Sequence, residues 1–337
     1  MERYALMAAA FTALFVTAFS GFLLIPWLKK LHFGQTIKEI GPIWHEKKNG
    51  TPTMGGLMFY LGVTFGIVAG YAMLVIGAPL LFSQIWSTET VNLLIAVLTT
   101  FAFGLVGFAD DYIKVIKKRN LGLLARYKIV LQIMITTAFL LSLYLNGTLT
   151  TLVQLPLIGV VDFGYFYYPI SYILIIGIVN AVNLTDGIDG LASSVTFIVM
   201  LGFMFVAGLL GYTTIALFTA AVAGGCAGFL SWNFYPAKTF MGDTGSMFLG
   251  GAVMAAAYCI GRPELLLFFG FVYICEALSV VMQVTYFKLT HGKRIFKMSP
   301  IHHHFEMCGW SEIKIVCMFS ATALVFVLIG CLYVYLN

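Results

Sequence analysis

Residues 190–237 read GLASSVTFIVMLGFMFVAGLLGYTTIALFTAAVAGGCAGFLSWNFYPA and contain no charged side chain. A helix needs about 20 apolar residues to cross the hydrocarbon core of a bilayer, so this run is too long for one crossing. Gly211 and Tyr212 are the most suitable place for a turn, since glycine strongly interrupts regular structure. The run therefore predicts two consecutive transmembrane helices, near residues 190–210 and 213–231.

The composition of the whole chain agrees with this prediction. Of the 337 residues, 61% are hydrophobic and 10% are charged, whereas a soluble domain carries about 25% charged residues. A soluble fold cannot hide so much apolar surface, so the composition excludes that class. We predict an all-α, polytopic membrane protein that forms a single domain over residues 1–337 and has ten transmembrane helices. These spans are placed near residues 5–28, 53–78, 90–109, 128–146, 168–184, 190–210, 213–231, 244–261, 265–287 and 313–336.

The basic residues predict how these helices are oriented. With ten spans, Arg3 and Arg262 lie on one side of the membrane, and the other 17 of the 19 lysine and arginine residues lie on the opposite side. The positive-inside rule marks that basic side as cytoplasmic and places both termini in the periplasm. The net charge of +5 then reflects membrane topology, and we expect no nucleic-acid partner.

Two other features of the chain carry no predicted chemistry. The external segment 148–166 mixes β-branched and aromatic residues around Pro156 and Gly159, which predicts a small periplasmic β-hairpin. The six cysteines lie mostly inside apolar runs and form no C-x-x-C pair. We therefore expect them to pack as small hydrophobic residues rather than to form disulfides or a zinc site.

The acidic residues mark the predicted site. Five of the 14 aspartate and glutamate residues lie at the cytoplasmic ends of spans, and ionisable groups at membrane depth are costly and usually functional. One such carboxylate could simply face headgroup water, but five on one face, beside glycine-rich loops, favour a site. The five are Asp110, Asp111, Asp186, Asp189 and Asp243.

Asp110 and Asp111 end the third span in the sequence GLVGFADDYIKVIKKRN, residues 104–120. Adjacent residues on a helix point about 100° apart, so the two carboxylates need not share one role. Lys114 follows at a spacing that brings it near both. Paired carboxylates beside lysines suit a magnesium–phosphate site, because Mg²⁺ binds one or two carboxylates together with phosphate oxygens. A salt-bridged helix end is the alternative.

Two loops carry the other three aspartates. NAVNLTDGIDGLA, residues 180–192, spaces Asn183, Asp186 and Asp189 by three; helix capping would account for one of them. In NFYPAKTFMGDTGSMFLGG, residues 233–251, Asp243 stands at the start of a predicted helix. A helix N-terminus attracts anions, and a carboxylate there would recruit the metal that bridges them. A simple N-cap is an equal alternative for Asp243.

Two more segments combine residues that contact phosphate or sugar in other proteins. GTPTMGG, residues 50–56, lacks the lysine of a Walker A loop, and it is either a phosphate or sugar contact or a glycine-rich start of a helix. SPIHHHFEMCGW, residues 299–310, holds three consecutive histidines with Glu306 and Cys308. Consecutive residues seldom converge on one metal, so polar contacts to phosphate or sugar are favoured over a zinc site or a plain surface cluster.

Five motifs of the chain resemble those of a known family. The five motifs GTPTMGG, FADDYIK, NLTDGIDG, NFYPAKTFMGDTGS and SPIHHHFE occur in the order found in the phospho-N-acetylmuramoyl-pentapeptide transferases. These belong to the polyprenyl-phosphate N-acetylhexosamine-1-phosphate transferase superfamily. The resemblance implies Mg²⁺ as cofactor, UDP-N-acetylmuramoyl-pentapeptide as donor and undecaprenyl phosphate as acceptor. It also implies a homodimer in the bacterial inner membrane, a site facing the cytoplasm, and a ninth span that is bent.

The resemblance also implies roles for individual residues. Asp243 is similar to the magnesium ligand of the family, and Asp111 to a support of the metal and phosphate site. Asp110 is similar to the base that deprotonates the lipid phosphate or, in a second scheme, to a covalent nucleophile. The other implied residues are phosphate contacts (Lys48, Lys114 and Lys118, with Thr53 nearby), residues on the nucleoside side (Asn183, Asp186, Asn233 and Phe240, the last stacking on uracil), and the essential histidines His302, His303 and His304. Asp189 is predicted to bind substrate, with no further role.

Two other functions compete with this one. A transporter also carries carboxylates at membrane depth, but its site lies near the midplane, where Glu276 is the only acidic residue inside a predicted span. A sister transferase that uses UDP-N-acetylglucosamine shares most of the motifs. The GTPTMGG and HHH segments favour the muramoyl-pentapeptide branch of the superfamily.

Overall fold

The computed structural model describes residues 2–30, 50–77, 87–116 and 122–337. Within these ranges the chain is helical, apart from one two-stranded sheet and the connecting loops. The helices are α1 (Glu2–Lys30), α2 (Leu57–Gly77), α3 (Thr88–Ile116), α4 (Ala125–Leu145), α5 (Tyr167–Thr185), α6 (Leu191–Leu209), α7 (Thr213–Asn233), α8 (Gly242–Cys259), α9 (Leu265–Phe269), α10 (Phe271–Leu289), α11 (Ile301–Met307) and α12 (Glu312–Leu336). The strands are β1 (Leu152–Leu155) and β2 (Gly159–Asp162).

Nine helices in the described ranges are long and apolar enough to cross a membrane. They are α1 to α7, α10 and α12, and they coincide with nine of the ten predicted spans, which confirms an all-α polytopic membrane protein. The tenth predicted span, 244–261, coincides with α8, an 18-residue helix whose first turn contains the polar residues Asp243 and Thr244. Ten crossings, and the side on which the termini lie, stay predictions.

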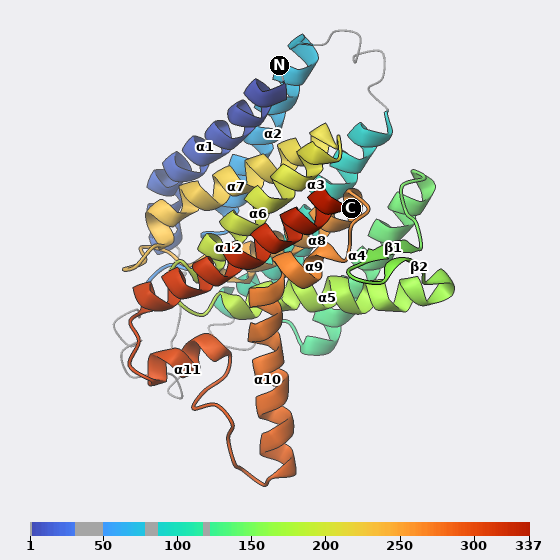
Figure 1. Ribbon diagram of the computed structural model, residues 1–337. Helices are drawn as coiled ribbons and strands as arrows, with labels where there is room; N and C mark the ends of the chain where they lie inside the picture. Colours follow the sequence, from blue (N-terminus) through green and yellow to red (C-terminus); the bar gives the residue numbers. More distant parts are fainter. Residues whose placement is uncertain (1, 31–49, 78–86, 117–121) are drawn as a thin grey trace.

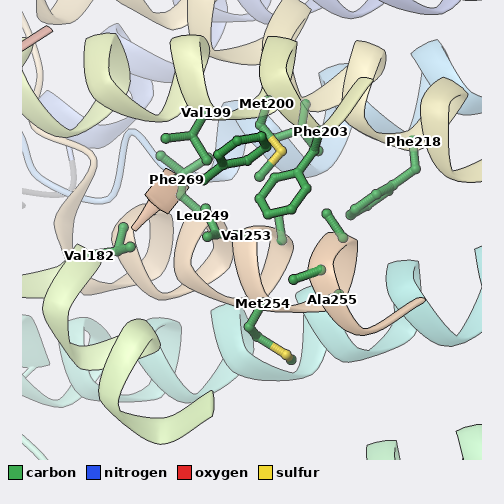
Figure 2. Packing of buried hydrophobic residues seen from close by; sticks show 14 of the residues in the cluster. Val182, Val199, Met200, Phe203, Phe218, Leu249, Val253, Met254, Ala255 and Phe269 are labelled. Carbon is green, nitrogen blue, oxygen red and sulfur yellow. The ribbon is translucent and has the colours of Figure 1, made fainter. Parts of the chain in front are cut away.

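Helix α8 lies at the centre of the bundle. Every residue from Thr244 to Cys259 is buried, and the helix packs mainly against α3 and α5. Figure 2 shows Leu249 and Val253 of α8 among buried side chains of neighbouring helices, including Phe203 of α6. The small residues of α8 let neighbouring helices approach it closely in lipid, where the hydrophobic effect does not drive helices together. This close packing holds the first turn of α8 against the end of α3.

The outer face of the bundle carries large apolar side chains. On α1, Phe11 and Phe15 are exposed, whereas Ala9 and Ala13 are buried against neighbouring helices. This is the reverse of a water-soluble helix, and it suits a surface that lipid covers. Figure 1 shows α1 lying beside α2 and α7 along its length, and these three helices pack together.

The predicted ninth span, 265–287, is broken at Gly270 into α9 and α10. A methyl group on Gly270 would lie 2.4 Å from the carbonyl oxygen of Leu266, so glycine allows the chain to turn sharply there. In Figure 1, α10 leaves the bundle and α11 lies beside it, below α12. The bend implied by the family resemblance is therefore present.

Two local predictions are confirmed. The strands β1 and β2 pair antiparallel, with Leu152 opposite Asp162, which is the hairpin expected in segment 148–166. The turn between α6 and α7 falls at Gly211, whose φ is +83°. Glycine adopts this left-handed conformation without the steric cost that a side chain would add.

Candidate active site

The first turn of α8 presents the carboxylate of Asp243. Its Oδ2 atom accepts hydrogen bonds from Lys114 Nζ at 3.1 Å and Lys128 Nζ at 3.0 Å. Its Oδ1 atom accepts one from Asn183 Nδ2 at 2.9 Å. The N-cap of α8 is Met241, whose side chain makes no capping hydrogen bond, and Asp243 lies two residues further into the helix, so the alternative that Asp243 is a simple N-cap is wrong. The carboxylate instead collects donors from α3, α4 and α5.

The end of α3 supplies two buried carboxylates that have different partners. Asp111 Oδ2 accepts hydrogen bonds from the backbone N–H of Thr244 at 2.9 Å and from its hydroxyl at 2.7 Å. Asp110 Oδ1 accepts one from the backbone N–H of Leu123 at 2.8 Å. A methyl group on Gly122 would lie 2.5 Å from that same oxygen, so glycine lets the chain close over Asp110. Asp111 thus binds the start of α8, and its sequence neighbour Asp110 binds the segment that leads into α4.

Lys114 links the three carboxylates. Its Nζ lies 2.5 Å from Asp110 Oδ2, 3.7 Å from Asp111 Oδ1 and 3.1 Å from Asp243 Oδ2. The first two contacts follow from the helical spacing of i, i+4 and i, i+3. The third joins α3 to α8 and depends on tertiary packing. Lys128, by contrast, has no motif around it, and the sequence places it only among the cytoplasmic basic residues.

These carboxylates fit a hard divalent cation. One ligand oxygen from each of Asp110, Asp111 and Asp243 lies within 4.8 Å of the others. Magnesium takes oxygen ligands, one or two of them carboxylates, and leaves room for phosphate and water. Of the His, Cys, Asp and Glu side chains that the structure describes, this trio is the group close enough to hold a metal ion.

A reciprocal amide pair lies one helical turn from the donors of Asp243. Asn180 Nδ2 of α5 donates to Gln132 Oε1 of α4 at 2.8 Å, and Gln132 Nε2 donates to Asn180 Oδ1 at 3.3 Å. Lys128 precedes Gln132 by four residues and Asn183 follows Asn180 by three, so each donor lies on the same helix face as one member of the pair. The pair joins α4 to α5 one turn away from Lys128 and Asn183, the residues through which these two helices contact Asp243. No sequence motif singles it out.

The loop between α5 and α6 is tied to the loop before α8. The buried carboxylate of Asp189 accepts a hydrogen bond from the backbone N–H of Ala237 at 2.8 Å. Asn233 Oδ1 accepts one from the backbone N–H of Gly190 at 3.1 Å. Asp189 therefore does not cap α6. These two predicted substrate residues fix the loops around the site.

Asp186 directly follows α5 and is half-buried. Burial first, and then the negative charges of Asp243 and Asp111, raise the pKa of its carboxyl well above the usual range. The burial of Asp186 and the charges beside it thus disfavour a further negative charge at this position.

The segment 50–56 pairs with the loop before α8. The backbone N–H of Phe240 donates to the Pro52 carbonyl at 2.9 Å, and the N–H of Gly55 donates to the Phe240 carbonyl at 2.8 Å. A methyl group on Gly56 would lie 2.2 Å from the backbone nitrogen of Gly245. The glycines therefore let α2 start directly against α8, which favours the interpretation as a glycine-rich start of a helix.

Thr53 nevertheless lies beside the carboxylates. A methyl group on Gly242 would be 2.8 Å from Thr53 Oγ1 and 2.5 Å from Asp111 Oδ2. The side chains of Thr53 and Asp111 therefore both lie close to the backbone of Gly242. Lys48 and Lys118, the other predicted phosphate contacts, lie outside the described residues.

The three histidines of α11 point to three different partners. His302 is fully buried, and its Nδ1 lies 3.0 Å from Glu276 Oε2 of α10. His303 Nδ1 lies 2.5 Å from Glu306 Oε2, and His304 Nδ1 accepts a backbone N–H bond from the preceding loop. Imidazoles that diverge in this way do not form a zinc site, so that alternative is wrong.

His302 connects α11 to the loop between α5 and α6. A methyl group on Gly187 would lie 2.1 Å from His302 Nε2, so the imidazole packs directly on the backbone between Asp186 and Asp189. Glu276, the acidic residue inside the predicted ninth span, holds the other side of the ring. The buried histidine therefore positions the loop that carries two predicted substrate residues.

A cavity of about 1140 Å³ lies at the other end of α3, with Arg3, Glu89 and Thr213 in its lining. None of the predicted site residues that the structure describes lines it. Because α3 has 29 residues and rises about 1.5 Å per residue, this cavity is remote from the carboxylates. It is not part of the site.

Two family descriptions match the sequence. Glycosyl transferase family 4 matches residues 93–261, which run from α3 through α8 and include the three clustered carboxylates. The description named phospho-N-acetylmuramoyl-pentapeptide-transferase signature 1 matches residues 48–59, which include Thr53 and the start of α2.

The chain is also similar over most of its length to proteins named phospho-N-acetylmuramoyl-pentapeptide-transferase. One from Halalkalibacterium halodurans is 45% identical over 307 residues, which cover 91% of this chain and 90% of the relative. One from Caldicellulosiruptor bescii is 46% identical over 310 residues, covering 91% of each. One from Heliobacterium modesticaldum is 46% identical over 311 residues, covering 92% of this chain and 91% of the relative.

Proposed function

The chain belongs to the phospho-N-acetylmuramoyl-pentapeptide transferases, and on that premise we propose its reaction. It transfers phospho-N-acetylmuramoyl-pentapeptide from the UDP-linked precursor to undecaprenyl phosphate, giving lipid I and UMP for peptidoglycan synthesis. The observation that carries this proposal is the gathering of Asp110, Asp111 and Asp243 within 4.8 Å, beside two lysines. They lie at helix ends, where a water-soluble donor and a lipid acceptor can both reach them.

The chemistry needs positive charge where two anions meet. An oxygen of the lipid phosphate attacks the β-phosphorus of the donor, and the bond from that phosphorus to UMP breaks. Asp243 and its two neighbours on α3 would hold Mg²⁺, which supplies charge that offsets the negative charge growing on UMP. Lys114 and Lys128 lie at the same point and stabilise the phosphates by direct ammonium contacts.

Asp110 has two candidate roles that one measurement separates. As a base, it takes a proton from the lipid phosphate and forms no bond to phosphorus. As a nucleophile, it forms an acyl phosphate with the donor and releases UMP before the lipid arrives. Labelled UMP would then exchange into the donor without any polyprenyl phosphate. The base scheme predicts no such exchange.

The loops around the carboxylates form the nucleoside side of the proposed site. Asp186 and Phe240 are assigned to donor binding, with the phenyl ring of Phe240 stacking on uracil. Support comes from the hydrogen bonds of Asn233 and Asp189, which hold the two loops together. His302 packs against the loop between α5 and α6 and supports this side of the site. His303 and His304 complete the histidine motif of α11.

We place this enzyme in the bacterial inner membrane, as one integral membrane domain over residues 1–337 with its site facing the cytoplasm. The apolar helices and the one-sided distribution of basic residues support that location. We also propose a homodimer. Light scattering of the detergent-solubilised protein, corrected for bound detergent, tests the dimer, and a mass of one chain would exclude it.

The reaction is tested in membrane vesicles that contain the protein and undecaprenyl phosphate. We expect UMP release from UDP-N-acetylmuramoyl-pentapeptide in the presence of Mg²⁺, its arrest by EDTA, and its recovery when Mg²⁺ is restored. Offering UDP-N-acetylglucosamine separately tests the sister activity, and turnover of that donor alone would refute the assignment. EDTA-resistant turnover would contradict the metal role. Movement of substrate without UMP release would mark a transporter.

A further inference from the structure

Lys114 stands out because it contacts all three carboxylates that would hold a cation. Its Nζ lies within 4.0 Å of an oxygen from each of Asp110, Asp111 and Asp243. Lys128 contacts only Asp243 among them. These are the same three residues that form the candidate metal group. A divalent cation that takes its ligands from this trio therefore needs the space in which the Lys114 ammonium lies.

The side chain of Lys114 is exposed enough for its ammonium group to move away from the carboxylates. Its side chain is 34% exposed, compared with 16% for Lys128. A lysine carries its ammonium on a flexible four-carbon stem and can hold it in water while the stem stays in place. Since Lys114 is on the last turn of α3, a change of side-chain rotamers is enough to move its charge out of the trio.

We propose that Lys114 is a displaceable counter-ion: it neutralises the carboxylate trio, is expelled when a divalent cation binds, and thereby becomes available to grip the donor phosphates. This rests on the proposed function for the identity of the phosphate ligand. Binding of the cation and of the nucleotide is then coupled through one side chain, in the reciprocal manner of any linked pair of sites. A bound cation therefore favours phosphate binding by Lys114, and phosphate binding by Lys114 favours the cation.

The first test measures cation affinity without any substrate. Mn²⁺ binding to the purified protein is followed by electron paramagnetic resonance for the wild type, Lys114→Met and Lys114→Arg. We expect Lys114→Met to bind Mn²⁺ about tenfold more tightly or better, because the cation no longer has to break charge-assisted hydrogen bonds to carboxylates. Lys114→Arg keeps the charge and should bind no more tightly than the wild type. Unchanged or weaker binding by Lys114→Met overturns the proposal.

Lys238→Met is the matched control. It removes the same charge, but the Lys238 ammonium lies over the Trp232 ring, 5.2 Å from its centroid, and has no ion pair with the trio among the described contacts. Its Mn²⁺ affinity should equal that of the wild type. An equal gain in Lys238→Met and Lys114→Met would show a general charge effect and overturn the proposal. Thermal unfolding verifies that each variant is folded, and Lys114→Gln replaces Lys114→Met if the latter is not.

The second test uses UMP as the probe in isothermal titration. In EDTA, Lys114 is held by the carboxylates, so wild type and Lys114→Met should bind UMP equally. With saturating Mn²⁺, the wild type should bind UMP more tightly than Lys114→Met. A difference of the same size already present in EDTA overturns the proposal. A wild type that binds no UMP at all would instead refute the proposed transferase function, and the Mn²⁺ result would stand on its own.

Discussion

Gly107 of α3 has no functional group, yet the structure makes it decisive for the active site. A methyl group at this position would lie 2.0 Å from the backbone oxygen of Asp243, 2.4 Å from its carbonyl carbon and 2.8 Å from the backbone nitrogen of Thr244. These are backbone atoms of the first turn of α8, which cannot rotate away as a flexible side chain would. The variant Gly107→Ala must therefore push α3 and α8 apart where they carry the carboxylates.

The size of this displacement follows from the distances. Ordinary contact begins at 3.4 Å, so the atoms 2.0 Å apart must separate by about 1.4 Å. The Thr244 N–H to Asp111 bond, now 2.9 Å, would lengthen beyond hydrogen-bonding distance. Overpacking of this kind costs about 1–3 kcal/mol of stability, and a shift of about 1 Å in a catalytic group costs about 100-fold in rate. We expect Gly107→Ala to fold but to lose about 100-fold in turnover.

The assay is UMP release in vesicles at saturating donor and Mg²⁺, with thermal unfolding of the same preparation. Gly177→Ala is the matched control, because it adds the same methyl group to a transmembrane helix, α5, where nothing lies within 4 Å. It should keep wild-type turnover. Near-normal turnover in Gly107→Ala would refute the reasoning, since the carboxylates would then tolerate a displaced α8.

Three further predictions concern side chains of the site. Asp243→Ala should lower UMP release by at least about 100-fold, as expected for loss of a group that stabilises transition-state charge; near-normal turnover of the purified variant would remove Asp243 from the catalytic set. The raised pKa of Asp186 means that its ionisation above about pH 4 costs the folded state free energy. In EDTA, Asp186→Asn should therefore unfold at a higher temperature than the wild type at pH 7 and at the same temperature below pH 4, and an equal unfolding temperature at pH 7 would contradict this. Gln132→Asn shortens the amide pair by one methylene and should slow turnover about 3- to 15-fold, the range of interhelical polar contacts in membranes. Adding Asn180→Gln to this variant should restore turnover. A double variant as slow as the single one would contradict a positioning role.

The sequence alone determines the fold class and the position of its helices. Long uncharged runs such as 190–237 have one stable solution in lipid, because every backbone N–H and C=O group must be satisfied within the segment. The helix ends, the turn at Gly211 and the small hairpin after α4 follow from local signals that act over a few residues. For the same reason the carboxylates at helix ends could be recognised, since ionisable groups are rare and costly at that depth.

Only the tertiary structure decides which of these polar groups meet, because contacts between distant positions, 115 apart for Lys128 and Asp243 and 48 apart for Gln132 and Asn180, leave no periodic signal in the chain. Lys128 and Gln132 lie on α4, which carries no motif. Lys128 donates to Asp243, and Gln132 pairs with Asn180 of α5, the helix that presents Asn183 to Asp243. The histidines show the same limit. Three consecutive residues look like one cluster in sequence, but the geometry of a short helix sends them to different partners and buries His302 against Gly187.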